Sequence, residues 1–185
     1  MTAIQVEGVV HDFGPVRALD SVSFVVPTGQ VTGFLGPNGA GKTTLMRILA
    51  GLVRLQQGRV TVLGRPPGSP GALSKVGAII ESPAFHPRLS GRDNLRYWCR
   101  IAGLRPGRVA SVLTVAGLGD RENDPVHTYS LGMKQRLGLA AAILNEPELL
   151  ILDEPQNGLD PAGRALLRRA ITNLGSSGAK GERWF

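Results

Sequence analysis

Several features that are common in other proteins are scarce or absent in these 185 residues. A single cysteine, Cys99, excludes a disulfide within the chain and a cysteine-rich metal site. No apolar run approaches the ~18 residues that a membrane span requires. The N-terminus also lacks the basic start and the apolar stretch of a signal peptide. We therefore expect a cytoplasmic protein that reaches a membrane only through a partner.

Acidic residues are also in short supply. The chain has 14 Asp and Glu against 21 Lys and Arg, which gives a net charge of +7 and a pI of about 10.5. Such a balance can indicate a nucleic-acid or membrane partner. The basic residues are scattered, however, without a run of five like charges, so we expect no nucleic-acid partner. The length and a hydrophobic content of 42% suffice for one globular domain.

The pattern of apolar residues changes repeatedly between strand and helix along the chain. Residues 31–35 are an almost continuous apolar run, which is typical of a buried parallel strand. Strands that alternate with helices favour an α/β fold with a largely parallel sheet. Strands are predicted at residues 4–10, 19–26, 31–35, 58–63, 76–80 and 149–152. Helices are predicted at residues 43–52, 131–144 and 161–174, and a helical segment at residues 91–118 with breaks at Gly103 and at Pro106-Gly107.

A glycine-rich segment, GPNGAGKT at residues 36–43, fits the Walker A pattern between the predicted strand and helix. Its glycines let backbone N–H groups turn inward around phosphate oxygens, at the partly positive start of a helix. Lys42 adds a full charge near the β- and γ-phosphates, and the Thr43 hydroxyl can ligate Mg²⁺. The predicted nucleotide-binding residues of this segment are Gly36, Pro37, Asn38, Gly39, Ala40, Gly41, Lys42, Thr43 and Thr44.

Two carboxylates, Asp153 and Glu154, follow the apolar residues 149–152. Ligands of open parallel sheets lie beyond the carboxyl ends of the strands, which predicts that this pair lies beside the glycine-rich segment. Asp153 can then hold Mg²⁺, and Glu154 can polarise an attacking water. Taken alone, an Asp-Glu pair before Pro155 is equally an ordinary polar strand exit.

Further motifs resemble those of ATP-binding cassette (ABC) proteins. The segment YSLGMKQR at residues 129–136 resembles the family's signature, whose usual core is Leu-Ser-Gly-Gly-Gln. Residues 157–160 resemble its D-loop, and residues 11–24 resemble its N-terminal strands, with Phe13 as the aromatic that stacks on adenine. Residues 76–95 resemble the bacterial branch that exports drugs and bacitracin. In the signature, Ser130, Gly132, Gln135 and Arg136 match, whereas Tyr129, Leu131 and Met133 depart.

The resemblance implies a P-loop NTPase with a RecA-like core, an N-terminal antiparallel β subdomain and an inserted helical subdomain at about residues 83–137. It implies an ATP-binding subunit that hydrolyses Mg-ATP to drive export through a separate transmembrane permease, peripheral on the inner face of the cell membrane. Two cassettes, as a homodimer or heterodimer, would pair head to tail. Each ATP would lie between the Walker A segment of one and Ser130, Gly132 and Asp160 of the other.

Two positions depart from the family's pattern. Glu81 stands where most members have glutamine, and we expect it to ligate the metal or a water at the catalytic site. The family also has a histidine about thirty residues past the D-loop, whereas all three histidines here precede Asp160. We favour a frameshift or truncation near Ala179 over a genuine short protein. Residues 176–185 are then an irregular, non-native tail, the domain lacks its C-terminal part, and its ATPase activity is reduced.

Other functions remain open at this point. A truncated cassette that binds nucleotide without turning it over fits the lack of a late histidine. A soluble cassette that acts on nucleic acid fits the positive charge, although the paired cassettes or long coiled coils of such proteins are absent from this sequence. An unrelated P-loop kinase is disfavoured by residues 129–136 and 157–160.

Overall fold

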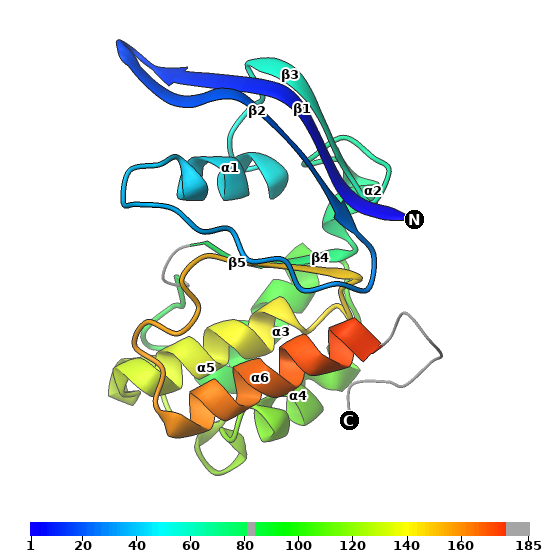
Figure 1. The fold of residues 1–185 in the computed structure, drawn as a ribbon. Coiled ribbons are helices and arrows are strands. Elements are labelled where there is room, and N and C mark those ends of the chain that lie inside the picture. The colour runs from blue at the N-terminus through cyan, green and yellow to red at the C-terminus, as the bar shows by residue number, and fades with distance from the viewer. Residues whose placement is uncertain (81–83, 177–185) are drawn as a thin grey trace.

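The computed structural model describes residues 1–80 and 84–176, arranged as a β-rich part above a helical part (Figure 1). Three strands form an antiparallel sheet in the order β2-β1-β3. These strands are β1 (Thr2–Phe13), β2 (Val16–Pro27) and β3 (Gln57–Val62). The helix α1 (Lys42–Leu49) lies under this sheet and buries Leu45 and Ile48 against it. The sheet and α1 therefore share one apolar core.

A second, parallel pair of strands lies between the two parts of the molecule. β4 (Val76–Ile79) pairs with β5 (Leu149–Leu152), with Val76 opposite Leu149. The short helix α2 (Pro70–Leu73) precedes β4. The two strands are far apart in sequence because the helical part is inserted between them, as Figure 1 shows.

The helical part has its own core. It contains α3 (Gly91–Ile101), α4 (Val109–Val115), α5 (Leu131–Ala142) and α6 (Pro161–Ser176). Three short 3-10 turns, Pro106–Arg108, Gly119–Arg121 and Val126–Thr128, join the first three helices. Fully buried leucines from three of these elements and their connections fill the interior: Leu95, Leu113, Leu118 and Leu137. None of the helices in residues 1–80 and 84–176 has the length and apolarity needed to cross a membrane.

Most predicted elements are confirmed, and the correct ones are those whose pattern is local. The strands predicted at residues 4–10, 19–26, 58–63, 76–80 and 149–152 and the helices at 43–52, 131–144 and 161–174 all form, with boundaries that shift by a few residues. The helical segment predicted at residues 91–118 forms with both of its predicted breaks, because Gly103 ends α3 in a left-handed turn and Pro106 starts a 3-10 turn.

The strand predicted at residues 31–35 is wrong. This segment has no strand structure, and Val31 and Leu35 are 69% and 95% exposed. A cleft of about 300 Å³ separates the segment from β5, and its walls include Phe34, Met46 and Ile151. Neighbouring strands must lie ≈4.8 Å apart to exchange hydrogen bonds, so residues 31–35 have no strand partner among the described residues. Among the described residues, parallel pairing is therefore limited to β4 and β5, whereas a largely parallel sheet was predicted.

Candidate nucleotide-binding site

The Walker A segment forms an exposed loop that leads into α1. Gly39 and Gly41 have φ of 81° and 79°, a left-handed backbone conformation that residues other than glycine rarely adopt. Lys42 is the first residue of α1, and its Nζ donates hydrogen bonds to the carbonyl oxygens of Gly36 at 2.9 Å and Pro37 at 2.8 Å. The lysine charge is thereby held over the loop, where a phosphate group would meet it.

The two glycines of the loop predict unequal costs of substitution. A Cβ at Gly41 would lie 2.2 Å from the carbonyl oxygen of Ala18 in β2, whereas a Cβ at Gly39 would meet nothing within 4 Å. We expect Gly39→Ala to lower the free energy of unfolding by about 1–2 kcal/mol for its dihedral alone. Gly41→Ala should cost about 1–3 kcal/mol more because backbone must move. Urea unfolding of the two variants measures this difference, and equal midpoints would contradict it.

The acidic pair lies at the end of β5, next to the start of α1. Thr43 Oγ1 donates a hydrogen bond of 2.5 Å to Asp153 Oδ2, across 110 residues of sequence. The backbone N–H of Asp153 donates to Ile79 O at 2.8 Å, which continues the parallel pairing and fixes the carboxylate. The structure therefore brings Thr43 and Asp153 together, as the sequence predicted, and their role as metal ligands stays a prediction.

Glu154 follows in a left-handed conformation with φ of 43°, which is strained for a residue with a side chain. Its carboxylate is exposed and accepts a hydrogen bond of 2.5 Å from Asn157 Nδ2. The bend turns Glu154 away from the strand direction and leaves it open to solvent beside Asp153. Glu81, the third predicted acidic residue, lies outside the described residues.

A divalent cation fits the oxygens at this position. The described residues contain no group of three His, Cys, Asp or Glu side chains that could hold a metal ion. Mg²⁺, however, keeps several waters and is commonly held by one or two protein oxygens together with substrate phosphates. The hydroxyl of Thr43 and the carboxylate of Asp153 supply two such hard oxygens.

The predicted adenine-stacking residue, Phe13, ends β1 at the hairpin turn and is half exposed. The ring of His11 packs edge-on against it, with ring centroids 4.7 Å apart. The start of β2 contacts the Walker A loop, since Leu19 lies close to Gly41. The hairpin turn and the start of α1 lie on the same side of the molecule in Figure 1. A base bound above α1 could therefore meet the exposed ring.

The predicted signature residues lie at the N-terminus of another helix. Ser130 caps α5, where its Oγ accepts a hydrogen bond of 3.2 Å from the Met133 backbone N–H. Gly132 packs against Asp160, because a Cβ there would lie 3.1 Å from Asp160 Oδ2. Asp160 in turn caps α6 by accepting a 2.7 Å hydrogen bond from the Gly163 N–H. These residues form a second cluster of helix starts.

The two clusters do not meet within one chain. Among the described residues, no hydrogen bond links Ser130, Gly132 or Asp160 to the Walker A loop. The N-terminal ends of α1, α5 and α6 nevertheless all lie on the left side of the view in Figure 1. Three partly positive helix ends thus occur on one side of the molecule, a distribution suited to anionic ligands.

Sequence reasoning noted Arg136 as part of a motif but missed its structural role. Its Nη1 donates to the carbonyl oxygens of Ala116 at 3.0 Å and Gly117 at 2.8 Å, and its Nη2 lies 3.5 Å from Asp160 Oδ2. The guanidinium therefore joins the end of α4, α5 and the start of α6. The Arg136 side chain is only 12% exposed, but it lies on a helix among other polar residues. Its burial could therefore not be predicted from the sequence.

A glycine-rich loop that opens a helix, with a hydroxyl and a strand-end carboxylate at its base, defines the P-loop nucleotide-binding class. The sequence profile of the family described as "ABC transporter" matches residues 19–157. This range covers more than half of the chain and includes the Walker A loop, Ser130 and Asp153. The chain therefore belongs to the ABC transporter family.

Curated relatives agree with this family. An ABC transporter ATP-binding protein of Bacillus subtilis, YhcH, is 43% identical over 94% of this chain and 58% of its own length. The lantibiotic transport ATP-binding protein SrtF of Streptococcus pyogenes is 41% identical over 95% of this chain and 76% of its own. The bacitracin transport ATP-binding protein BcrA of Bacillus licheniformis is 40% identical over 94% and 58%. The chain thus spans little more than half the length of several relatives.

Solved structures show the same fold. An ATP-binding subunit of an ABC transporter superposes with a TM-score of 0.85 at 28% identity, over 95% of this chain and 76% of that one. The ADP conformation of MJ1267, an ATP-binding cassette of an ABC transporter, superposes with a TM-score of 0.78 at 23% identity, which supports the fold alone. The predicted fold class, a P-loop NTPase with an antiparallel β subdomain and an inserted helical subdomain, is confirmed.

Proposed function

We propose that this chain is the ATP-binding and ATP-hydrolysing part of an ABC transporter and drives export through a separate permease. The observation that carries this proposal is the hydrogen bond between Thr43 and Asp153 beneath the Walker A loop, since it joins the two motifs that the chemistry requires at one point. The names of SrtF and BcrA, a lantibiotic and a bacitracin transport ATP-binding protein, support a role in transport.

The residues of the site support hydrolysis by positioning and charge. The loop N–H groups and Lys42 would hold the triphosphate, and Phe13 would stack on the base. A bound Mg²⁺, held by Thr43 and Asp153, would offset the charge that builds on the phosphate oxygens. Glu154 would accept a proton from the attacking water, because its exposed carboxylate lies directly beyond Asp153. Glu81 is proposed to contact the metal or a water from outside the described residues.

Ser130, Gly132 and Asp160 are proposed to act on the nucleotide of a second cassette, as a homodimer or heterodimer. They lie at helix starts that face the same side as the Walker A loop, yet none is bonded to it. A head-to-tail pair would place these helix starts against the partner's γ-phosphate. Ser130 is exposed, and its short side chain carries a hydroxyl that can bind a phosphate oxygen.

The permease is proposed to dock on the helical subdomain, residues 83–137. A groove of about 350 Å³ runs between α3 and β4, lined by Leu73, Trp98, Ile101 and Leu104 among others. Ile101 on α3 is an exposed large side chain of this groove. An apolar groove of this kind suits a short helix from a membrane protein. Such docking would hold the chain on the inner face of the cell membrane.

The cleft beside residues 31–35 supports a second candidate, a chain that binds nucleotide but turns it over slowly by itself. The crossover after β5 continues through α6, and a right-handed return would bring a following strand back beside β5. The cleft lies between β5 and residues 31–35, where such a strand would pair with both. We infer that the domain is completed there by a further strand that the described residues do not supply.

One assay tests both candidates. Phosphate release from Mg-ATP is measured for the full-length protein with its permease and for residues 1–185 alone, each with and without excess EDTA. We expect about 1 s⁻¹ or more for the full protein, loss of activity on chelation, and a much lower rate for the short chain. A full protein without Mg-dependent turnover would contradict the function. A short chain with the full rate would contradict the need for a further segment.

A further inference from the structure

Two segments that are distant in the sequence lie side by side just before α5. Residues 87–92 lead into α3, and residues 121–129 lead into the signature. Because their backbones are directly hydrogen-bonded, the start of α3 and the approach to Ser130 form one unit. The bonds run from Val126 N to Leu89 O at 3.0 Å, from His127 N to Pro87 O at 2.9 Å, and from Arg92 N to Glu122 O at 2.9 Å.

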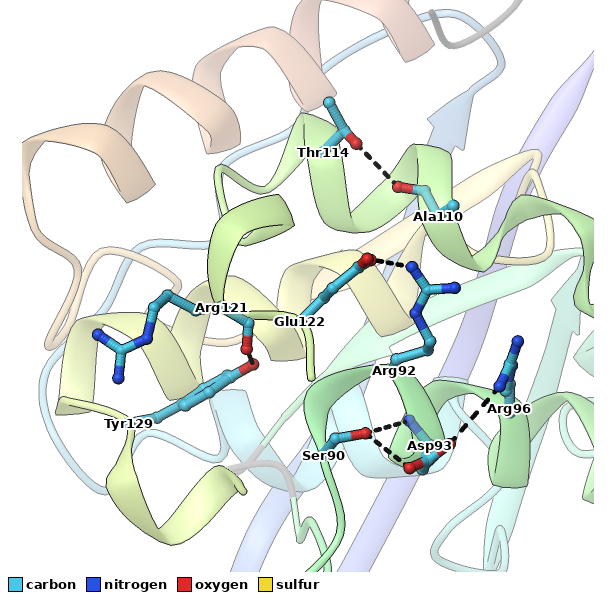
Figure 2. Close-up of polar contacts among 9 residues, drawn as sticks. All are labelled: Ser90, Arg92, Asp93, Arg96, Ala110, Thr114, Arg121, Glu122 and Tyr129. Atoms are coloured by element: carbon cyan, nitrogen blue, oxygen red, sulfur yellow. Dashed lines mark hydrogen bonds and ion pairs between the residues drawn. The ribbon is translucent and has the colours of Figure 1, made fainter. Parts of the chain in front are cut away.

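Side chains strengthen the same junction, as Figure 2 shows. Arg92 Nη2 and Glu122 Oε1 form an ion pair in which the side chains are only 28% and 17% exposed. Partial burial makes such a pair less subject to screening than one on the open surface. Ser90 caps α3 by accepting a 3.0 Å hydrogen bond from the Asp93 N–H. The first turn of α3 is thus fixed both within the helix and to residues 121–122.

Tyr129 closes this junction from the signature side. It is 4% exposed, and its hydroxyl donates a 2.6 Å hydrogen bond to Arg121 O. Burial raises the pKa of the Tyr129 phenol, so the hydroxyl keeps its proton for this bond. The hydroxyl also fits closely against the first residue of α3, since a Cβ at Gly91 would lie 2.5 Å from it. The residue that follows Tyr129 in the chain is Ser130.

We propose that Tyr129 is a positioning residue that sets Ser130 relative to the first turn of α3. This inference rests on the proposed function, in which Ser130 meets the partner's phosphate and α3 meets the permease. A displacement of α3 would be carried through Gly91 to the Tyr129 hydroxyl and from there to the adjacent Ser130. Phosphate contacts depend on sub-ångström placement, so the ring would control turnover without touching nucleotide.

The test compares Tyr129→Phe with Tyr97→Phe in the full-length protein with its permease. The chain has two tyrosines, and Tyr97, exposed on α3, is the matched control. We expect Tyr129→Phe to lower kcat about tenfold per folded molecule while KM for ATP changes little, and Tyr97→Phe to leave kcat unchanged. A role in stability alone would lower the melting temperature and leave kcat intact, which would overturn the proposal.

Gly91→Ala supplies the second arm. Its new methyl group would collide with the Tyr129 hydroxyl, but in a Tyr129→Phe background the nearest ring atom lies 3.3 Å away. The two substitutions should therefore be non-additive in kcat, with the double variant no slower than Tyr129→Phe. Simple additivity would overturn the coupling.

Amide hydrogen exchange tests the positioning role of Tyr129 separately from the proposed function, because exchange can be measured whether or not the protein hydrolyses ATP. Gly91→Ala should speed exchange in residues 130–134 as well as in the first turn of α3. Faster exchange confined to α3 would overturn the positioning role whether or not the protein hydrolyses ATP. A wild-type protein without turnover but with coupled exchange would instead contradict the proposed function and leave the mechanical link between Gly91 and Ser130 standing.

Discussion

Replacement of Glu154 by glutamine is expected to stop ATP hydrolysis while ATP remains bound. Glutamine keeps the size of the side chain and can still accept the hydrogen bond from Asn157 Nδ2, but it cannot accept a proton from water. Removal of a general base typically costs 10²–10⁴-fold, so we expect kcat to fall by at least about a hundredfold. Phosphate release under saturating Mg-ATP, together with equilibrium nucleotide binding, measures the two effects separately.

Glu148 provides the control for this substitution. It lies at the opposite end of β5, is exposed, and forms an ion pair of 2.6 Å with Lys75. Glu148→Gln removes the same charge from the residue just before β5, without touching the site. Exposed ion pairs contribute little, so activity and stability should stay close to those of the wild type. If the two glutamine variants hydrolyse ATP at the same rate, Glu154 is not the base.

The site illustrates which parts of a fold can be predicted from one sequence. The meeting of Thr43 and Asp153 was predictable, because both follow from local patterns combined with one rule about strand ends. The cap that Ser130 provides was predictable in the same way, because its hydroxyl stands directly before the helix predicted at residues 131–144. These features depend on residues within one turn or one strand, so the rest of the fold need not be known.

Residues 31–35 show where such prediction ends. Their apolar run has the composition of a buried strand, but strand formation needs a partner whose backbone groups are in reach. The described chain instead has a cleft there, and the Phe34 ring packs on Phe24 of β2 at a centroid distance of 5.2 Å. Composition therefore predicted the environment that these residues favour, whereas pairing depends on which other strands are present.

The junction around Tyr129 was missed for a different reason. Its departure from the usual signature was visible, but the hydroxyl's partner is a backbone carbonyl at Arg121, which has no sequence signature. The same holds for Arg136, whose two carbonyl partners are chosen by the path of the chain after α4. Contacts from a side chain to a distant backbone depend on tertiary geometry and cannot be predicted from spacing.

Replacement of Lys42 by alanine is expected to weaken nucleotide binding strongly, in contrast to the Glu154 variant, which binds ATP but does not hydrolyse it. The ammonium group is the only full positive charge within the Walker A segment of residues 36–43. A charge-assisted hydrogen bond contributes about 1.5–3 kcal/mol, and a triphosphate would accept more than one from this group. Because 1.4 kcal/mol corresponds to a tenfold change in Kd, we expect ATP affinity to fall by about a hundredfold or more.

The fold should tolerate this change. Lys42 Nζ bonds two exposed loop carbonyls, at Gly36 and Pro37, which water can satisfy when the amine is removed. Calorimetric titration of ATP into Lys42→Ala, with Lys75→Ala as the surface-lysine control, measures the affinity, and thermal unfolding checks the fold. A variant that binds ATP as tightly as the wild type would show that the loop N–H groups hold the triphosphate without the lysine. The charge held over the loop would then have no part in recognition.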